Sequence, residues 1–114
     1  MSFIYFASPY TSPSSKLLEE RFQATEKAVA DYLNKGVYVY SPIVHCHELA
    51  KRHKLPTDFS FWVAYNYAML DAASELYVFM LPGWASSTGV TAEIARAALR
   101  NIPIRYVEPG IPPC

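Results

Sequence analysis

Residues 75–93 read ELYVFMLPGWASSTGVTAE, and this stretch sets the expectation for the fold. Its residues 76–81 form a short apolar and aromatic run, which is typical of a strand buried in a parallel sheet. A Pro-Gly pair ends the run, small residues follow, and an alanine-rich helix begins with Glu93 near its first turn. This order places free backbone N–H groups and a helix dipole beside one carboxylate. Such a place can bind a phosphate or hold an ionised acid for chemistry.

Strands alternate with helices through the rest of the chain. Residues 43–54 are the least clear segment; they favour a short helix but hold all three histidines. The alternation predicts a three-layer α/β/α fold of the flavodoxin-like or Rossmann-like class, with a mostly parallel sheet of four or five strands. Right-handed crossovers then favour the strand order 2-1-3-4. The predicted strands are residues 3–7, 37–40, 76–81 and 104–107, and the clearer helices are 15–34, 58–73 and 90–100.

The composition bounds the classes of partner. A chain of 114 residues, 52% of them hydrophobic, can bury a core as a single domain over residues 1–114. The formal net charge is zero, whereas a nucleic-acid polymer or an anionic membrane favours an excess of Lys and Arg. No apolar run approaches the roughly 20 residues that cross a bilayer, and the start lacks the basic segment of a signal peptide. We therefore expect a cytoplasmic protein, in which Cys46 and Cys114 form no disulfide framework.

Ligands of such sheets bind beyond the carboxyl ends of the strands, at the switch point between strands 1 and 3. Glu93 is expected there as an ionised carboxylate, although acids are also ordinary in first turns of helices. Ser87 and Gly89 suit a phosphate but equally a helix cap. Asn66 falls on the buried stripe of its helix, so its amide needs either backbone partners or a ligand. Tyr5, in strand 1, needs a partner for its hydroxyl if it is buried.

Further side chains are placed at the same edge of the sheet. Ser8, Pro9 and Tyr10 end strand 1, and an aromatic at a strand end, such as Tyr10 or Trp84, can stack on a base. His45, just after strand 2, is the histidine we expect to line the cleft. Trp62 lies on the helix that crosses the cleft, where core packing is its default role.

Several motifs together resemble the nucleoside 2-deoxyribosyltransferase superfamily, which includes the 2′-deoxynucleoside 5′-phosphate N-hydrolases. The resemblance covers nearly the whole chain, and residues 55–62 and 81–84 are similar to a smaller bacterial and phage group within the superfamily. The motifs that carry it are Tyr5-Phe6-Ala7-Ser8-Pro9, Ser41-Pro42 and Ser87-Thr88-Gly89-Val90-Thr91-Ala92-Glu93.

The resemblance implies roles for individual residues. Glu93 would attack the anomeric carbon to form a covalent deoxyribosyl-enzyme, Tyr5 would hold that carboxylate, and Ser87 would contact the phosphate. An Asp usual on the helix before strand 3 matches Asn66 here, and an amide cannot protonate a leaving base. Asp58 and Asp71 are the other acids nearby, but neither matches the pattern.

The resemblance also implies a homo-oligomer, a dimer or tetramer, with sites near subunit boundaries. Candidate interface residues are Tyr65, Tyr67, Trp84 and the proline-rich tail of residues 108–114.

The residues and the resemblance together predict cleavage of the N-glycosidic bond of a nucleoside or nucleoside 5′-monophosphate, with hydrolysis favoured over base exchange. The partner is then a small molecule, and the chemistry requires no metal or other cofactor. A non-catalytic nucleotide-binding module of the same fold is the alternative, and Asn66 in place of Asp favours it. A metal-dependent hydrolase built on His45, His47 and His53 is weaker, since their spacing lacks a second ligand cluster.

Overall fold

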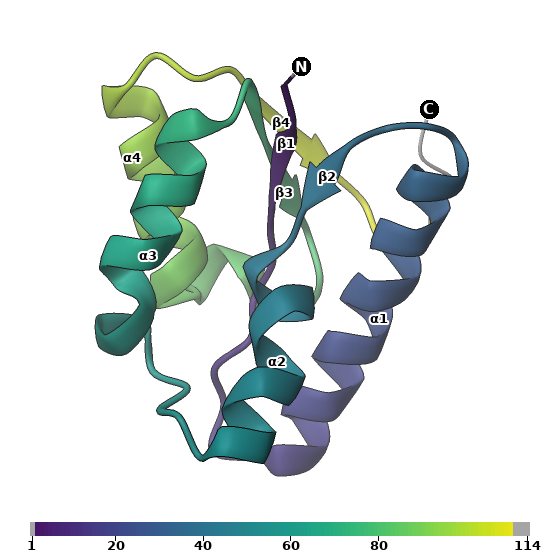
Figure 1. Cartoon of the computed structure of the whole chain (residues 1–114), viewed down its shortest axis with the longest axis vertical. Helices are drawn as coiled ribbons and strands as arrows, with labels where there is room; N and C mark the ends of the chain where they lie inside the picture. The colour runs from purple at the N-terminus through teal and green to yellow at the C-terminus, as the bar shows by residue number, and fades with distance from the viewer. Residues whose placement is uncertain (1, 111–114) are drawn as a thin grey trace.

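The computed structural model describes residues 2–110, in which parallel strands alternate with helices (Figure 1). Each predicted strand and helix is present, and residues 43–54 lie in a regular helix. In chain order the elements are β1 (Ile4–Ala7), α1 (Ser15–Asn34), β2 (Val39–Tyr40), α2 (Pro42–His53), α3 (Phe59–Ala72), β3 (Glu75–Phe79), the 3₁₀ turn η1 (Trp84–Ser86), α4 (Thr88–Leu99) and β4 (Ile104–Val107).

The four strands form one parallel sheet in the order β2-β1-β3-β4, which confirms the predicted fold class and strand order. Tyr5 on β1 is in register with Tyr40 on β2 and with Leu76 on β3. The two inner strands, β1 and β3, are buried along almost their whole length, as expected for strands covered on both faces.

Helices cover both faces of the sheet, with α3 and α4 on one side and α1 and α2 on the other (Figure 1). Side chains of β1 alternate between the two faces. Tyr5 and Ala7 join the core that packs under α3 and α4, whereas Ile4 and Phe6 join the core under α1. This alternation turns Tyr5 toward the helix that carries Glu93.

Serine side chains fix where three helices begin. Ser14, Ser41 and Ser87 each accept a hydrogen bond from the backbone N–H three residues later, at the starts of α1, α2 and α4. Because Ser87 is the cap, α4 begins at Thr88, two residues before the predicted start. Glu93 is therefore the sixth residue of α4 and lies in its second turn, two residues further into the helix than the predicted start implied.

Smaller differences concern the ends of other elements. Strand β2 has two residues instead of the predicted four. Strand β3 covers residues 75–79 instead of 76–81, and α3 begins at Phe59 with Asp58 at its N-cap position, one residue after the predicted start. The longest helix of the described part, α1, is amphipathic, and none of the helices within residues 2–110 could span a bilayer.

The topology leaves a crevice at the carboxyl ends of β1 and β3. After β1 the chain turns to α1 on one face, and after β3 it turns to α4 on the opposite face. The two connections therefore diverge, and the space between them is the usual ligand position of an open parallel sheet.

Candidate active site

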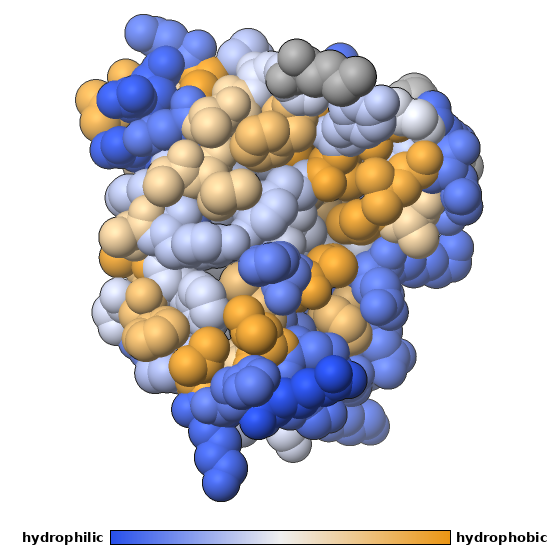
Figure 2. All heavy atoms as spheres, in the orientation of Figure 1, coloured by the Kyte–Doolittle hydropathy of each residue, from blue (hydrophilic) through white to orange (hydrophobic). Residues whose placement is uncertain are grey.

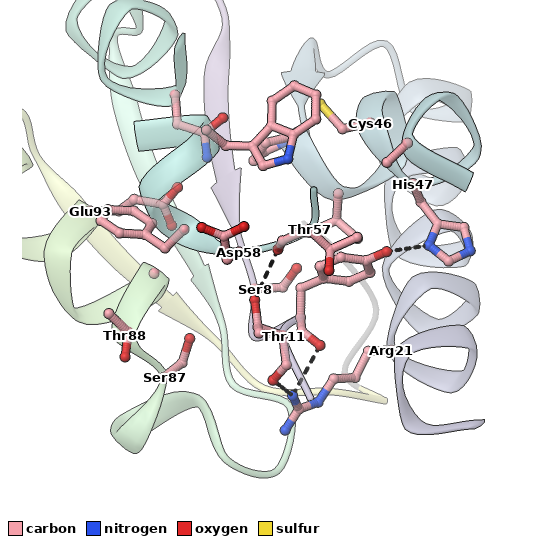
Figure 3. A pocket seen from close by; sticks show the side chains of 18 of the residues that line it. Ser8, Thr11, Arg21, Cys46, His47, Thr57, Asp58, Ser87, Thr88 and Glu93 are labelled. Atoms are coloured by element: carbon pink, nitrogen blue, oxygen red, sulfur yellow. Dashed lines mark hydrogen bonds between the residues drawn. The ribbon is translucent and has the colours of Figure 1, made fainter. Parts of the chain in front are cut away.

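A pocket of about 430 Å³ opens at this crevice (Figure 3). Its volume lies in the range of sites for small organic ligands. The wall is built from the loops after β1 and β3 and from residues of α1, α2, α3 and α4. Of the residues predicted to bind substrate or act in catalysis, those that line it are Ser8, Tyr10, Trp62, Asn66, Ser87, Gly89 and Glu93.

Glu93 and Tyr5 form a buried pair at the wall of this pocket. Glu93 is 4% exposed and Tyr5 is fully buried behind it, and the Tyr5 hydroxyl donates a hydrogen bond to Oε2 of Glu93. The bond from Tyr5 reaches Oε2 alone, and within residues 2–110 no hydrogen bond to the second carboxylate oxygen, Oε1, is found. The pair therefore presents one held oxygen and one oxygen free for a ligand.

Burial controls the protonation of this pair. Loss of water raises the pKa of the Glu93 carboxyl from its ordinary 4.5 to about 7, and the hydrogen bond from Tyr5 opposes that rise. Burial and the neighbouring carboxylate hold the pKa of Tyr5 well above its ordinary 10, so Tyr5 remains a donor. The sequence argument expected a carboxylate kept ionised by a helix terminus. In the second turn of α4 desolvation dominates instead, and Glu93 titrates near neutral pH.

Asn66 offers an unsatisfied acceptor to the same space. Its side chain is 9% exposed and lines the pocket, and its Oδ1 atom is buried without a hydrogen-bond partner within residues 2–110. A buried polar atom without a partner is unusual in a folded protein, because it has lost water and gained nothing. A hydroxyl or amino group of a ligand would satisfy Asn66 Oδ1. The sequence left open whether backbone groups or a ligand satisfy this amide, and no backbone group of residues 2–110 bonds its oxygen.

The loop after β3 brings hydroxyls and one guanidinium to the edge of the pocket. Ser86, Ser87 and Thr88 line it together with Arg21 of α1, the only Arg or Lys in the described lining. Ser87 Oγ accepts the hydrogen bond of the Val90 N–H, so it is the helix cap as well as a lining residue.

Arg21 ties two loops together across this edge. Its Nη1 donates to the carbonyls of Tyr10 and Thr11, and its Nη2 donates to the carbonyl of Pro82. The Nε atom is buried and has no hydrogen-bond partner in the described part of the chain. A guanidinium with an unused N–H at the rim of a pocket is suited to an anionic group of a ligand. Sequence reasoning missed Arg21, which is one isolated basic residue on a helix of mixed charge.

Gly83 makes room for this arginine. Its backbone has a φ of +93°, and a Cβ atom at this position would lie 2.8 Å from Arg21 Nη2. Only glycine adopts this conformation readily and leaves that space empty. The Pro82-Gly83 pair, read in the sequence as the end of a strand, thus also positions the arginine.

Of the three histidines, His47 is the one that lines the pocket, whereas His45 was expected there. His45 is exposed on the opposite side of α2 and stacks on Tyr65, with ring centroids 6.1 Å apart. His47 is 6% exposed and faces inward with Cys46 and Ala50. The sequence could favour His47 over His45 only if residues 43–54 were known to be helical, because helical spacing places residues 46, 47 and 50 on one side.

His47 is bonded through both ring nitrogens. Its Nδ1 lies 2.6 Å from the Tyr10 hydroxyl, and its Nε2 lies 3.1 Å from Glu19 Oε1 (Figure 3 marks the first bond). The ring also stacks on Phe22 at a centroid distance of 4.1 Å. Tyr10, expected to stack on a base, is thus held by a hydrogen bond at the wall of the pocket.

The remaining predicted residues divide between the pocket and the core. Trp62 lines the pocket, and its indole Nε1 donates to the Pro56 carbonyl, which fixes the ring. Pro9 is fully buried and does not line it. Trp84 does not line the pocket, and its ring contacts that of Tyr106 in a tilted arrangement, with centroids 5.6 Å apart.

The two acids considered as proton donors have separate surroundings. Asp71 is paired with Arg96 at 2.6 Å and with Arg100 at 3.8 Å, away from the pocket. The hydrogen bonds from Arg96 hold the pKa of Asp71 below its ordinary value. Asp58 does line the pocket, but a hydrogen bond from Ser60 lowers the pKa of its exposed carboxyl as well. Both groups are therefore ionised at neutral pH.

The histidines and Cys46 are the remaining side chains that could bind a metal or act as a nucleophile. His45, His47 and His53 do not converge, and no group of three or more potential ligand side chains comes together within residues 2–110. Cys46 is a free, buried thiol at the pocket wall. Burial raises its pKa to about 11, so it stays protonated and is a poor nucleophile. Cys114 lies outside the described residues.

The surface of the predicted interface is only partly exposed. Tyr65 is 38% exposed, whereas Tyr67 is covered by the Arg96 guanidinium at 5.0 Å from its ring centroid. Apolar side chains reach the surface over α2 and beside β2 (Figure 2). Residues 111–114 of the proline-rich tail lie outside the described residues. The homo-oligomer stays a prediction.

A family model described as a domain of unknown function (DUF1937) matches residues 2–108, and the chain therefore belongs to this family. The matched segment contains every residue that lines the pocket. A comparison with curated proteins found no match. The family description names no activity.

Proposed function

We propose that this member of the DUF1937 family cleaves the N-glycosidic bond of a nucleoside or nucleoside 5′-monophosphate, with Glu93 as the nucleophile. The observation that carries the proposal is the buried Tyr5–Glu93 pair at the wall of a ligand-sized pocket. The proposal places the family in the nucleoside 2-deoxyribosyltransferase superfamily, to which the motifs at Tyr5, Ser87 and Glu93 are similar.

The chemistry of the pair suits attack on a sugar. A carboxylate can add to the anomeric carbon as the base departs, and the resulting glycosyl-enzyme is then resolved by water. With a pKa of about 7, a substantial fraction of Glu93 is ionised at neutral pH. Tyr5 holds Oε2 and leaves Oε1 for the anomeric carbon. Because the carboxylate is poorly hydrated, it is a stronger nucleophile than an exposed one.

The other lining residues support a nucleotide as the ligand. Asn66 Oδ1 can accept a hydrogen bond from a sugar hydroxyl. Arg21 and the hydroxyls of Ser86 and Thr88 offer a place for a 5′-phosphate beside the N-terminus of α4. Hydrolysis is favoured over base exchange, because these groups suit a phosphate. A transferase would need only a sugar hydroxyl to be held at this place.

The test is release of free base from a panel of nucleosides and 5′-monophosphates, followed by chromatography. The wild type is expected to release base, and Glu93→Gln is expected to lose at least about a thousandfold in rate. The matched control is Glu75→Gln, a residue outside the pocket. Base release by Glu93→Gln at the wild-type rate would contradict the proposal.

A non-catalytic nucleotide sensor is the second candidate, and the amide at Asn66 favours it. Such a module would bind nucleotides and show no turnover. A melting temperature raised by a nucleotide, with no base released from any member of the panel, would establish the sensor in place of the enzyme.

A further inference from the structure

The proposed reaction needs a proton for the leaving base, and the acids nearest the pocket do not provide one. Asn66 has no acidic proton, and Asp71 lies outside the pocket in its ion pair with arginine. Asp58 lines the pocket as an exposed carboxylate and accepts a hydrogen bond from Ser60. General acid catalysis is worth about a hundredfold or more, so its source matters for the rate.

A chain of three side chains reaches the pocket from the other side. Tyr10 and His47 line the pocket, and the Tyr10 hydroxyl lies 2.6 Å from His47 Nδ1. His47 Nε2 lies 3.1 Å from Glu19 Oε1. The chain thus runs from a hydroxyl at the wall, through a buried imidazole, to a carboxylate at the surface. Imidazole is the side chain best suited to pass a proton between two such groups.

The imidazole of His47, at the centre of these three side chains, is buried and in contact with other rings. The His47 ring is 6% exposed and is stacked on Phe22 with an interplanar angle of 18°. Tyr10 meets the imidazole edge-on, with ring centroids 5.6 Å apart. The charged groups around His47 are Glu19, Glu48 at 3.9 Å, and Lys51, which lies 4.0 Å from Glu19.

The chain also lies on the side that the chemistry demands. A nucleophile and the proton donor must approach the glycosidic bond from opposite sides, since the base leaves as the nucleophile attacks. Figure 3 shows Glu93 and His47 on opposite sides of the pocket. A proton donor on the side of the base away from the sugar can reach N7 of a purine. It reaches O2 of a pyrimidine less readily, because that atom is next to the glycosidic bond.

We propose that Tyr10 is the general acid of the reaction and that it protonates N7 of a purine base. His47 and Glu19 position the Tyr10 hydroxyl and restore its proton. This inference rests on the proposed function. As the C1′–N9 bond breaks, its electron pair stays with the base, and a Glu93 oxygen bonds to C1′. The Tyr10 proton moves to N7, and the His47 Nδ1 proton moves to the Tyr10 oxygen. Water then displaces Glu93 from C1′, and the proton it releases returns to His47.

The test compares two leaving groups. The probes are 2′-deoxyguanosine 5′-monophosphate and its N7-methylated form, whose base departs without being protonated. Tyr10→Phe keeps the ring but removes the hydroxyl, and it is expected to lower kcat on the unmethylated probe by about a hundredfold. On the methylated probe the loss is expected to stay within about threefold. Tyr38→Phe, an exposed residue outside the pocket, is the matched control and is expected to match the wild type on both probes.

Glu19→Gln provides a second variant at the surface end of the chain. It keeps an acceptor for His47 but removes the charge, and Glu19 is 39% exposed, so the fold is expected to tolerate it. It should slow the unmethylated probe selectively by about tenfold. A selective loss with either variant supports the proposal, since a merely structural role would slow both probes alike.

Equal losses on the two probes, or no loss with both variants, would overturn this inference alone. A wild type that releases pyrimidine bases but no guanine from either probe would do the same. A wild type that releases no base from any nucleotide would overturn the proposed function, and this inference with it.

Discussion

The Glu93 carboxyl is buried where its ionised form has little solvation, and one hydrogen bond from Tyr5 offsets only part of that loss. A structural role alone would be served better by glutamine or by an apolar side chain, which carry no such penalty. Groups with strongly shifted pKa values in pockets are frequent in catalysis. At the scale of single residues, this loss of stability is what we expect of a carboxylate that is kept in the pocket as a nucleophile.

This penalty predicts a particular dependence of stability on pH. Folding raises the pKa of Glu93 from 4.5 to about 7, so between these values the folded protein binds more protons than the unfolded chain. The stabilisation from this group is full below pH 4.5 and is lost as pH rises through 7. Between pH 5 and 8 the wild type should lose on the order of 2 kcal/mol relative to Glu93→Gln.

Urea denaturation of the two proteins at both pH values measures this difference. The comparison isolates Glu93, because all other titrating groups are shared. If the free energy of unfolding changed with pH in the same way in the wild type and Glu93→Gln, burial would not destabilise the ionised carboxylate, and the prediction would be wrong.

At the scale of elements, the loop between β3 and α4 determines where Glu93 and Arg21 lie. Ser87 sets the start of α4, and Gly83 leaves the space that Arg21 occupies. The backbone conformation at Gly83 therefore determines where the Arg21 side chain lies at the rim of the pocket.

Gly83→Ala tests this coupling, and Gly36→Ala is its matched control. Both glycines have a positive φ, of +93° and +77°, so each alanine variant should lose roughly 1–2 kcal/mol of stability. Only at Gly83 does the added Cβ meet Arg21; at Gly36 nothing lies within 4 Å. Base release should fall several-fold in Gly83→Ala and stay at the wild-type level in Gly36→Ala. Equal activities in the two variants would show that the conformation at Gly83 does not affect the site.

Sequence reasoning was limited at this scale by element ends and by one undecided helix. The predicted start of α4 was late because serine caps look like ordinary loop residues in a sequence, and this misplaced Glu93 by two residues along the helix, about half a turn. His45 was preferred over His47 because residues 43–54 were not firmly helical, so no inward side could be assigned. The partners Arg21 and Glu19 depend on contacts between distant segments, which no local pattern reveals.

At the scale of the whole molecule, the alternation of strands and helices was sufficient to predict the parallel sheet and its order. Handedness of the crossovers leaves few topologies for such a chain, and the observed order β2-β1-β3-β4 is among them. The same topology placed the pocket, because the connections after β1 and β3 leave the sheet on opposite faces. Tyr5, Asn66 and Glu93, which are far apart in the sequence, were therefore predicted to share one site, and the structure brings them together.

The whole fold should be stabilised by its ligand. A nucleoside 5′-monophosphate is expected to raise the melting temperature more than the matching nucleoside, because Arg21 adds a contact to the phosphate. In Arg21→Gln the two ligands should give equal shifts, each measured against the same variant without ligand. A larger nucleotide shift that survives in Arg21→Gln would place the phosphate elsewhere.

The central claim is that Glu93 bonds to the sugar, and mass spectrometry of the trapped protein tests it most directly. A 2′-fluoro-arabino analogue of the substrate nucleotide slows breakdown of the glycosyl-enzyme, because fluorine disfavours the oxocarbenium-like transition state. After an acid quench and digestion, the peptide containing Glu93 should carry the added mass of the fluorinated sugar phosphate, and the Glu93→Gln protein should carry none. A label on another residue, or base release without any label, would contradict the account.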